Sequence, residues 1–133
     1  DELFQETLLL AVPEGHPLAH QSAAPTAECL PAEELIHLKD GHCLRDQVLQ
    51  ACGLRRCDSR LQCDQLETAI AMVAANLGVA VVPQLAVEGR SVPNVSFRAF
   101  ASPVPQRQIY RLQRSGTHLT KAAQKLLEAS LFQ

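Results

Sequence analysis

The sequence predicts an α/β domain in which strands and helices alternate along the chain. Residues 7–12 and 79–82 are continuously apolar, without the alternation of polar and apolar residues that marks a strand with one solvated face. Such runs indicate strands buried on both faces, as in a parallel sheet. Between the apolar runs lie segments such as 64–77, in which apolar residues recur at helical spacing. Strands that alternate with helices are typical of α/β folds.

The same patterns place the individual elements in order. Strands are expected at residues 7–12, 34–38, 59–63, 79–82, 96–100 and 108–112. Helices are expected at residues 43–52, at 64–77 and from about 117 onward, with single helical turns at 26–30 and 84–88. Residues 13–17 read as a turn, and residues 18–24 as a short helix or a loop.

Local signals mark the ends of the two central helices. Gly53 follows the first helix as its expected C-cap, and Gly78 ends the second. Asp64, with Glu67 three residues later, predicts a capping box at the start of the second helix. Its apolar stripe consists of Leu66, Ile70, Val73 and Leu77. The expected apolar face of the last helix consists of Leu119, Ala122, Leu126 and Leu127.

Composition limits the classes of function. The chain has 133 residues, of which 47% are hydrophobic and 20% charged, which suits one soluble globular domain. A net charge of −2 indicates no nucleic-acid-binding surface, so any DNA contacts are expected outside these residues. No apolar run is long enough for a membrane span and no signal peptide is evident, so we expect a cytoplasmic protein without a membrane partner. Because the chain does not begin with Met, it is expected to be a fragment or a processed form.

Five cysteines are an odd number, so they cannot all pair within one chain; they are Cys29, Cys43, Cys52, Cys57 and Cys63. Their spacing lacks Cys-x-x-Cys, which argues against a structural zinc site made by the last four. Cys43 and Cys52 lie nine residues apart on a predicted helix, a rise of about 13.5 Å. A disulfide needs Cα atoms within roughly 7 Å. Either these thiols are unrelated, or joining them requires the helix to unfold.

Several motifs resemble the effector-binding domain of LysR-type transcriptional regulators. They are Val-Pro-Glu-Gly-His-Pro-Leu-Ala at residues 12–19, Leu-Glu-Thr at 66–68, Met-Val-Ala-Ala at 72–75, Gly78 and Pro83. Asp-Gly-His-Cys-Leu-Arg-Asp-Gln at residues 40–47, with Cys52 after it, is similar to the peroxide-sensing members of that family.

The resemblance implies a periplasmic-binding-protein-like (type 2) fold with two α/β subdomains. Residues of about 13–105 would form a complete second subdomain, and residues 1–12 and 106–133 the crossover strands and returning helix of a truncated first subdomain. The DNA-binding domain would be absent, so DNA would be bound only through that missing N-terminal domain. A homo-oligomer, either a dimer or a tetramer, is also implied.

The resemblance also implies roles for particular residues. Cys43 would be the thiol that hydrogen peroxide oxidises, and Cys52 the thiol that resolves it to a disulfide, remodelling the domain. Arg45 or Arg107 would stabilise the thiolate, while His42 and Asp46 would orient peroxide and assist proton transfer. No metal and no cofactor are expected.

Two other classes of function remain open at this point. In one, the domain binds a small metabolite and Cys43 is an unreactive packing residue. In the other, Cys43 and His42 serve a thiol peroxidase or a Cys–His hydrolase. Adjacent residues on a helix rarely face each other, which argues against an enzyme. Cys29, Cys57 and Cys63 match no role in the family and are interpreted as incidental. We therefore predict a redox-sensing regulatory domain that is not an enzyme.

Overall fold

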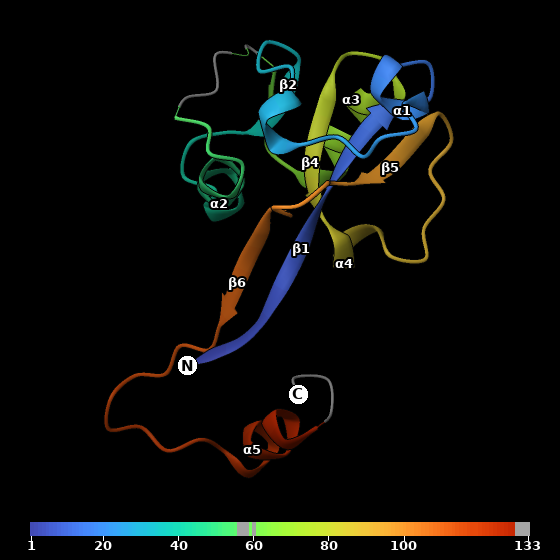
Figure 1. Ribbon diagram of the computed structural model, residues 1–133. Helices are drawn as coiled ribbons and strands as arrows, with labels where there is room; N and C mark the ends of the chain where they lie inside the picture. The colour runs from blue at the N-terminus through green and yellow to red at the C-terminus, as the bar shows by residue number, and fades with distance from the viewer. Residues whose placement is uncertain (56–58, 60, 130–133) are drawn as a thin grey trace.

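The structure, a computed structural model, describes residues 1–55, 59 and 61–129. A six-stranded sheet forms its centre, with helices on both faces (Figure 1). The strands are β1 (Glu2–Pro13), β2 (Leu35–Leu38), β3 (Gln62–Cys63), β4 (Val79–Pro83), β5 (Val95–Ala99) and β6 (Gln106–Tyr110). The helices are α1 (Pro17–His20), α2 (Cys43–Ala51), α3 (Leu66–Ala74), α4 (Gln84–Val87) and α5 (Lys121–Glu128), with a 3-10 turn, η1, at Ala27–Cys29.

The sheet is mixed and is built around β1. Its strand order is β3-β2-β4-β1-β5, and β6 pairs with the N-terminal half of β1. Among the described strands, β2 pairs in parallel with β3 and with β4, whereas β1 is antiparallel to β4, β5 and β6. The expectation of a parallel arrangement around residues 7–12 is therefore wrong. Continuous apolar character shows that both faces of a strand are covered, but it does not show the direction of the neighbouring strands.

Burial on both faces of the sheet is confirmed. Along β1, Leu8, Leu10 and Val12 face a core that also contains Val48 and Cys52. The opposite face of the sheet is covered by α3, whose Ala69, Ile70 and Val73 pack with Ala11 of β1 in a second core. β4 contributes to both, with Val79 and Val81 in the first core and Ala80 and Val82 in the second. The domain thus has three layers, with α1 and α2 on one side of the sheet and α3 on the other.

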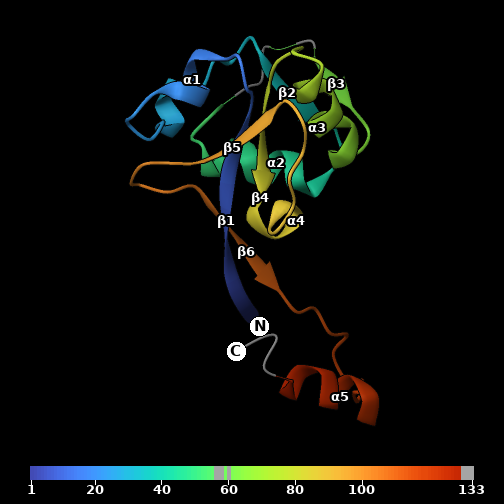
Figure 2. The same ribbon diagram turned by 90° about the vertical axis from the view of Figure 1, so that its right-hand side faces the viewer.

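β1 and β6 extend beyond the three layers as a two-stranded ribbon (Figures 1 and 2). β6 begins two residues earlier than expected, and Leu112 after it is 93% exposed. α5 lies apart from the sheet and begins at Lys121, four residues later than expected, after Thr120 caps it through a hydrogen bond from the Ala123 N–H. Leu119, expected on the apolar face of this helix, lies before α5, and Ala122, Leu126 and Leu127 are not fully buried against any partner within the described residues.

The predicted capping box of α3 is wrong. Gln65 occupies the N-cap and makes no side-chain capping bond. Asp64 instead pairs with Lys39 at 2.9 Å, and the Glu67 carboxylate pairs with Arg90 at 2.8 Å. The helix also ends earlier than expected, so Leu77 lies beyond it and is 55% exposed. Local spacing cannot predict these outcomes, because the two cations are distant in the sequence. Lys39 draws Asp64 away from the helix N-terminus, and Arg90 does the same to Glu67. Among the described residues, no helix is long and apolar enough to cross a membrane.

Gly78 is required for close packing between β4 and the segment before β2. A Cβ atom built at this position would lie 2.2 Å from the backbone oxygen of Glu34, with Leu61 and Ile36 side chains close behind. The adjacent Val79 N–H donates to the same Glu34 oxygen at 3.0 Å, so the backbone cannot retreat without losing this hydrogen bond.

Gly78→Ala is therefore expected to lower the free energy of unfolding by about 1–3 kcal/mol, the usual cost of overpacking. Urea denaturation followed by circular dichroism measures this change. Gly15→Ala is the matched control, since a Cβ there meets nothing within 4 Å and Gly15 is not among the residues with positive φ. Equal unfolding midpoints for the two variants would show that the close approach at Gly78 does not affect the free energy of unfolding.

Candidate functional site

The candidate site is built on α2, which forms as the sequence predicts. A turn at Asp40 and Gly41 leads into the helix, and Gly41 has a φ of +92°, which favours glycine. At the other end, Gly53 has a φ of +66°; its N–H donates to Gln50 O, and the Leu54 N–H donates to Leu49 O. These two bonds make a Schellman motif, which confirms Gly53 as the residue that ends the helix.

The two cysteines of interest lie at opposite ends of α2 and in opposite environments. Cys43 is the first helical residue and is exposed, whereas Cys52 follows the last turn and is only 7% exposed in the first core. Burial raises the pKa of the Cys52 thiol from 9.0 to about 11. Both thiols are free. Because α2 is intact, its rise of about 13.5 Å keeps them too far apart for a disulfide.

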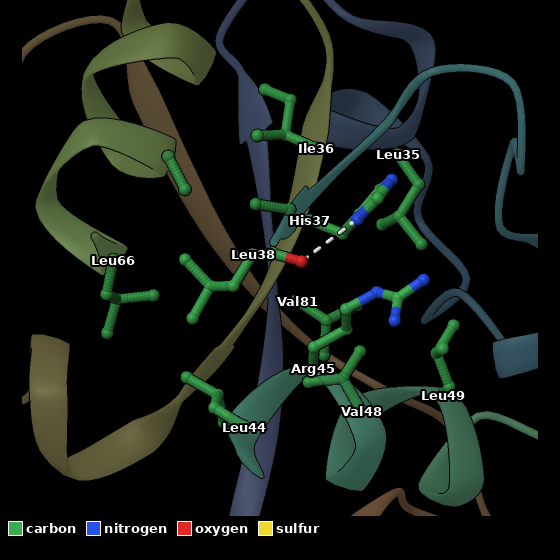
Figure 3. Close-up of a pocket in the computed structure, with 12 residues that line it drawn as sticks. Leu35, Ile36, His37, Leu38, Leu44, Arg45, Val48, Leu49, Leu66 and Val81 are labelled. Carbon is green, nitrogen blue, oxygen red and sulfur yellow. Dashed lines mark hydrogen bonds between the residues drawn. The ribbon is translucent and has the colours of Figure 1, made fainter. Parts of the chain in front are cut away.

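Arg45 does not share the face of α2 that carries Cys43. Its side chain extends into an apolar cavity of about 20 Å³, among His37, Val48 and Leu49 (Figure 3). Its guanidinium pairs with Asp40, and the Arg45 Nε atom is buried without a hydrogen-bond partner among the described residues. Residues two apart on a helix point in different directions, so Arg45 is poorly placed to stabilise a Cys43 thiolate.

Arg107 contacts α2 from the neighbouring ribbon. Its Nη1 donates to Gln47 Oε1 at 3.3 Å, and its Nε donates to Glu6 Oε2 at 2.7 Å. Gln47 is four residues after Cys43 and therefore lies on the same face of α2. Of the two arginines that the sequence nominated, only Arg107 is linked to the face that carries Cys43.

The other two nominated side chains are open to solvent. His42 occupies the N-cap of α2 and makes no side-chain capping bond. Asp46 has a 75% exposed side chain, with its Oδ1 4.0 Å from Arg45 Nη1. Both are close to Cys43 in the chain, and both are accessible to a small oxidant from solution.

Sequence reasoning missed Glu6 and Gln47, which complete the contacts of Arg107. Glu6 is 4% exposed, and no local pattern distinguishes it from the other polar residues that precede the apolar run of β1. Gln47 belongs to the 40–47 motif, but its spacing of four from Cys43 was the only available signal of its position.

α2 is held to the domain by few apolar contacts. Within the helix only Val48 is fully buried, with Leu44 and Ala51 partly buried against the first core. α3, of the same length, buries Ala69, Ile70 and Val73. Segments that bury few apolar side chains open at lower free energy than the rest of a fold. α2 is therefore better suited than α3 to local rearrangement.

The remaining cysteines lie in dissimilar places. Cys29 is exposed and accepts a hydrogen bond from Thr26 Oγ1 at 3.1 Å. Cys63 is buried on β3, and its pKa is raised chiefly by burial. Cys57 lies outside the described residues. Across the parts of the chain that the structure describes, no three His, Cys, Asp or Glu side chains gather as a metal site.

The contrast between Cys43 and Cys52 predicts selective alkylation. At pH 8 the Cys52 thiol, with a pKa of about 11, is thiolate in about 1 molecule in 1,000, and burial also shields it from the reagent, whereas Cys43 is exposed. Iodoacetamide should therefore label Cys43 well before Cys52 in the folded protein. Tryptic peptides 40–45 and 46–55 separate the two sites for mass spectrometry. In urea the difference should vanish, and equal rates in the folded protein would contradict the burial of Cys52.

The raised pKa also has a consequence for stability. The folded state holds the Cys52 proton more tightly than the unfolded state, so this contribution to the free energy of unfolding is fully present below pH 9. It is lost as the pH rises towards 11. Urea midpoints between pH 8 and 11 should therefore fall more steeply for the wild type than for Cys52→Ala.

Comparison with known proteins places this arrangement in a family. Residues 1–131 match the LysR substrate binding domain. The hydrogen peroxide-inducible genes activator of Haemophilus influenzae is 38% identical over 131 residues, which are 96% of this chain and 43% of that protein. The chain thus spans less than half the length of this relative.

Solved structures agree with this placement. The crystal structure of the reduced form of OxyR is 36% identical, with a TM-score of 0.77 over 96% of this chain and 60% of that chain. The oxidised form of OxyR, also 36% identical, has a TM-score of 0.70 over 96% of this chain and 61% of that chain. The expected α/β, periplasmic-binding-protein-like class is confirmed. The chain belongs to the LysR substrate-binding domain family of transcription regulators.

Proposed function

We propose that this chain is the redox-sensing regulatory domain of an OxyR-like regulator, in which hydrogen peroxide oxidises Cys43 and Cys52 resolves it to a disulfide. The observation that carries this proposal is the placement of two free cysteines at the two ends of one lightly buried helix. The peroxide-inducible relative and the OxyR structures support the same function. The higher TM-score to the reduced form accords with free thiols and an intact α2.

The chemistry balances in two steps. The Cys43 thiolate attacks one oxygen of peroxide, the O–O bond breaks, and hydroxide leaves and is protonated to water, so that a sulfenic acid remains. Cys52 then attacks the sulfenic sulfur, the S–S bond forms, the S–O bond breaks and a second water leaves. Two thiols and one peroxide thus give one disulfide and two waters. Arg107 supports the thiolate, and the exposed His42 and Asp46 deliver the proton to the leaving hydroxide.

The second step requires α2 to open. Cys52 must leave the first core, which exposes it and removes the cause of its high pKa. Loss of the helix then separates Gln47 from Arg107, and so disturbs the contact between α2 and the ribbon. The oxidised and reduced domains become two states of one switch.

We infer the surroundings of this switch from its likeness to the family. Residues of about 13–105 act as the second subdomain, and residues 1–12 and 106–133 as crossover strands and returning helix of the first. DNA is bound through a separate domain in a cytoplasmic homo-oligomer. The domain itself is not an enzyme, since the oxidation is stoichiometric.

A groove beside α2 supports a second candidate, the binding of a small metabolite. It is lined by Gln5, Gln47, Gln50, Ala51, Gln106, Arg107, Gln108 and Tyr110. Amide groups and one arginine suit a small polar or anionic ligand. In this alternative Cys43 has no chemical role.

A non-reducing tryptic mass map distinguishes the two candidates. Stoichiometric peroxide should cross-link peptide 40–45 to peptide 46–55, and the untreated protein should show both peptides free. Tris(2-carboxyethyl)phosphine should reverse the link. If both peptides stay free at a modest excess of peroxide, the metabolite-binding candidate is favoured instead.

In the full-length regulator, Cys43→Ser is expected to abolish the transcriptional response to peroxide, because it removes the attacking sulfur. Cys29→Ser is the matched control, as Cys29 is also exposed but lies outside α2, and it should leave the response intact. Cys57→Ser should likewise leave it intact. Reporter expression before and after peroxide measures the response, and a normal response from Cys43→Ser would refute the proposal.

A further inference from the structure

Glu6 is a buried carboxylate at the point where β1 leaves the sheet and enters the ribbon with β6. Its side chain is 3% exposed, although Glu is among the residues least often buried. Glu6 Oε1 accepts a hydrogen bond from the Leu85 N–H at the start of α4, at 3.0 Å. Glu6 Oε2 lies 2.7 Å from Arg107 Nε and 2.6 Å from Arg107 Nη2. Both carboxylate oxygens are thus occupied, and the carboxylate is fixed in place.

This carboxylate takes up most of the hydrogen-bonding capacity of Arg107. The guanidinium turns two of its nitrogens to Glu6, and the third donates to Gln47, one helical turn beyond Cys43. The Arg107 side chain is 21% exposed, so its charge is only partly screened by water. A cation that is paired with a fixed carboxylate offers less stabilisation to a neighbouring thiolate than an unpaired one.

We propose that Glu6 is a positioning residue that restrains the reactivity of Cys43 by holding and neutralising Arg107 beside α2. This inference rests on the proposed function, in which the Cys43 thiolate is the reactive species. Glu6 belongs to β1 and Arg107 to β6, so the restraint comes from the strands and not from the helix that carries the thiol.

Other charged groups near Cys43 do not replace this pair. On α2, Arg45 is paired with Asp40 and turned into the apolar cavity, and Asp46 is exposed. His42 is exposed at the N-cap. On β6, Tyr110 is bonded to Gln108. The Glu6 carboxylate is the buried charge in direct contact with Arg107.

The test is the pH dependence of Cys43 alkylation in Glu6→Gln, measured on peptide 40–45 without peroxide. Glutamine has nearly the same shape and can still accept from Arg107, but it carries no charge. The rate at pH 7 should rise about 3- to 10-fold, and the midpoint of the pH–rate profile should move to lower pH. Glu67→Gln is the matched control, because its carboxylate pairs with Arg90 on the surface, and its profile should equal that of the wild type.

Two further variants separate the charge effect from a loss of packing. Arg107→Gln leaves Glu6 as an unpaired carboxylate, so the midpoint should move to higher pH. In the Arg107→Gln background, adding Glu6→Gln should not raise the rate above that of the wild type, since no cation remains to be released. General loosening of the fold would instead raise the rate in every variant, and urea midpoints identify any variant that fails to fold.

An unchanged profile in folded Glu6→Gln would overturn the inference, as would a rate above that of the wild type in the Glu6→Gln, Arg107→Gln double variant. If Glu6→Gln does not fold, the test depends on Arg107→Gln. An unshifted midpoint of its pH–rate profile would also overturn the inference. Failure of this inference can be told apart from failure of the proposed function. Peroxide-driven cross-linking of the wild-type protein tests the switch, whereas alkylation tests only the control of Cys43 by Glu6.

Discussion

The structure depends on one strand that serves three partners. β1 pairs with β4 and β5 through its C-terminal half and with β6 through its N-terminal half, so a single backbone joins the sheet to the ribbon. Leu8 and Leu10 are completely buried, which leaves the strand little freedom to slip or rotate. This constraint also fixes the direction of the Glu6 side chain. The same pleat that directs Leu8 and Leu10 into the core directs Glu6 towards Arg107 and α4.

The candidate redox helix has the opposite character. α2 rests on the first core through Val48 and the cap residue Cys52, and its side-chain bond to the strands runs through Gln47 and Arg107. A rigid strand beside a lightly attached helix is an arrangement in which one element can change while the other keeps its geometry. Under the proposed function, the strands provide the fixed reference against which the helix moves.

Most of the fold could be predicted from local patterns, and the contacts that decide the site could not. The turn before Cys43 and the glycine after Cys52 predicted α2 correctly, because capping depends on neighbouring residues. Glu67 satisfied the same kind of local rule, but it pairs with Arg90 across the surface. Arg107 was nominated only by resemblance, and its partner Glu6 is 101 residues away in the sequence. Such pairings depend on strand register, which a single sequence does not display.

The light attachment of α2 has a thermodynamic meaning for the proposed disulfide. Because Cys43 and Cys52 cannot join while α2 is intact, the free energy that holds the helix in the reduced state opposes oxidation. For a two-electron couple, about 1.4 kcal/mol corresponds to about 30 mV in reduction potential. Each apolar group that α2 buries therefore makes the disulfide easier to reduce. Under the proposed function, the packing of Val48 in the reduced state raises the reduction potential of the disulfide without any change in the sulfur chemistry.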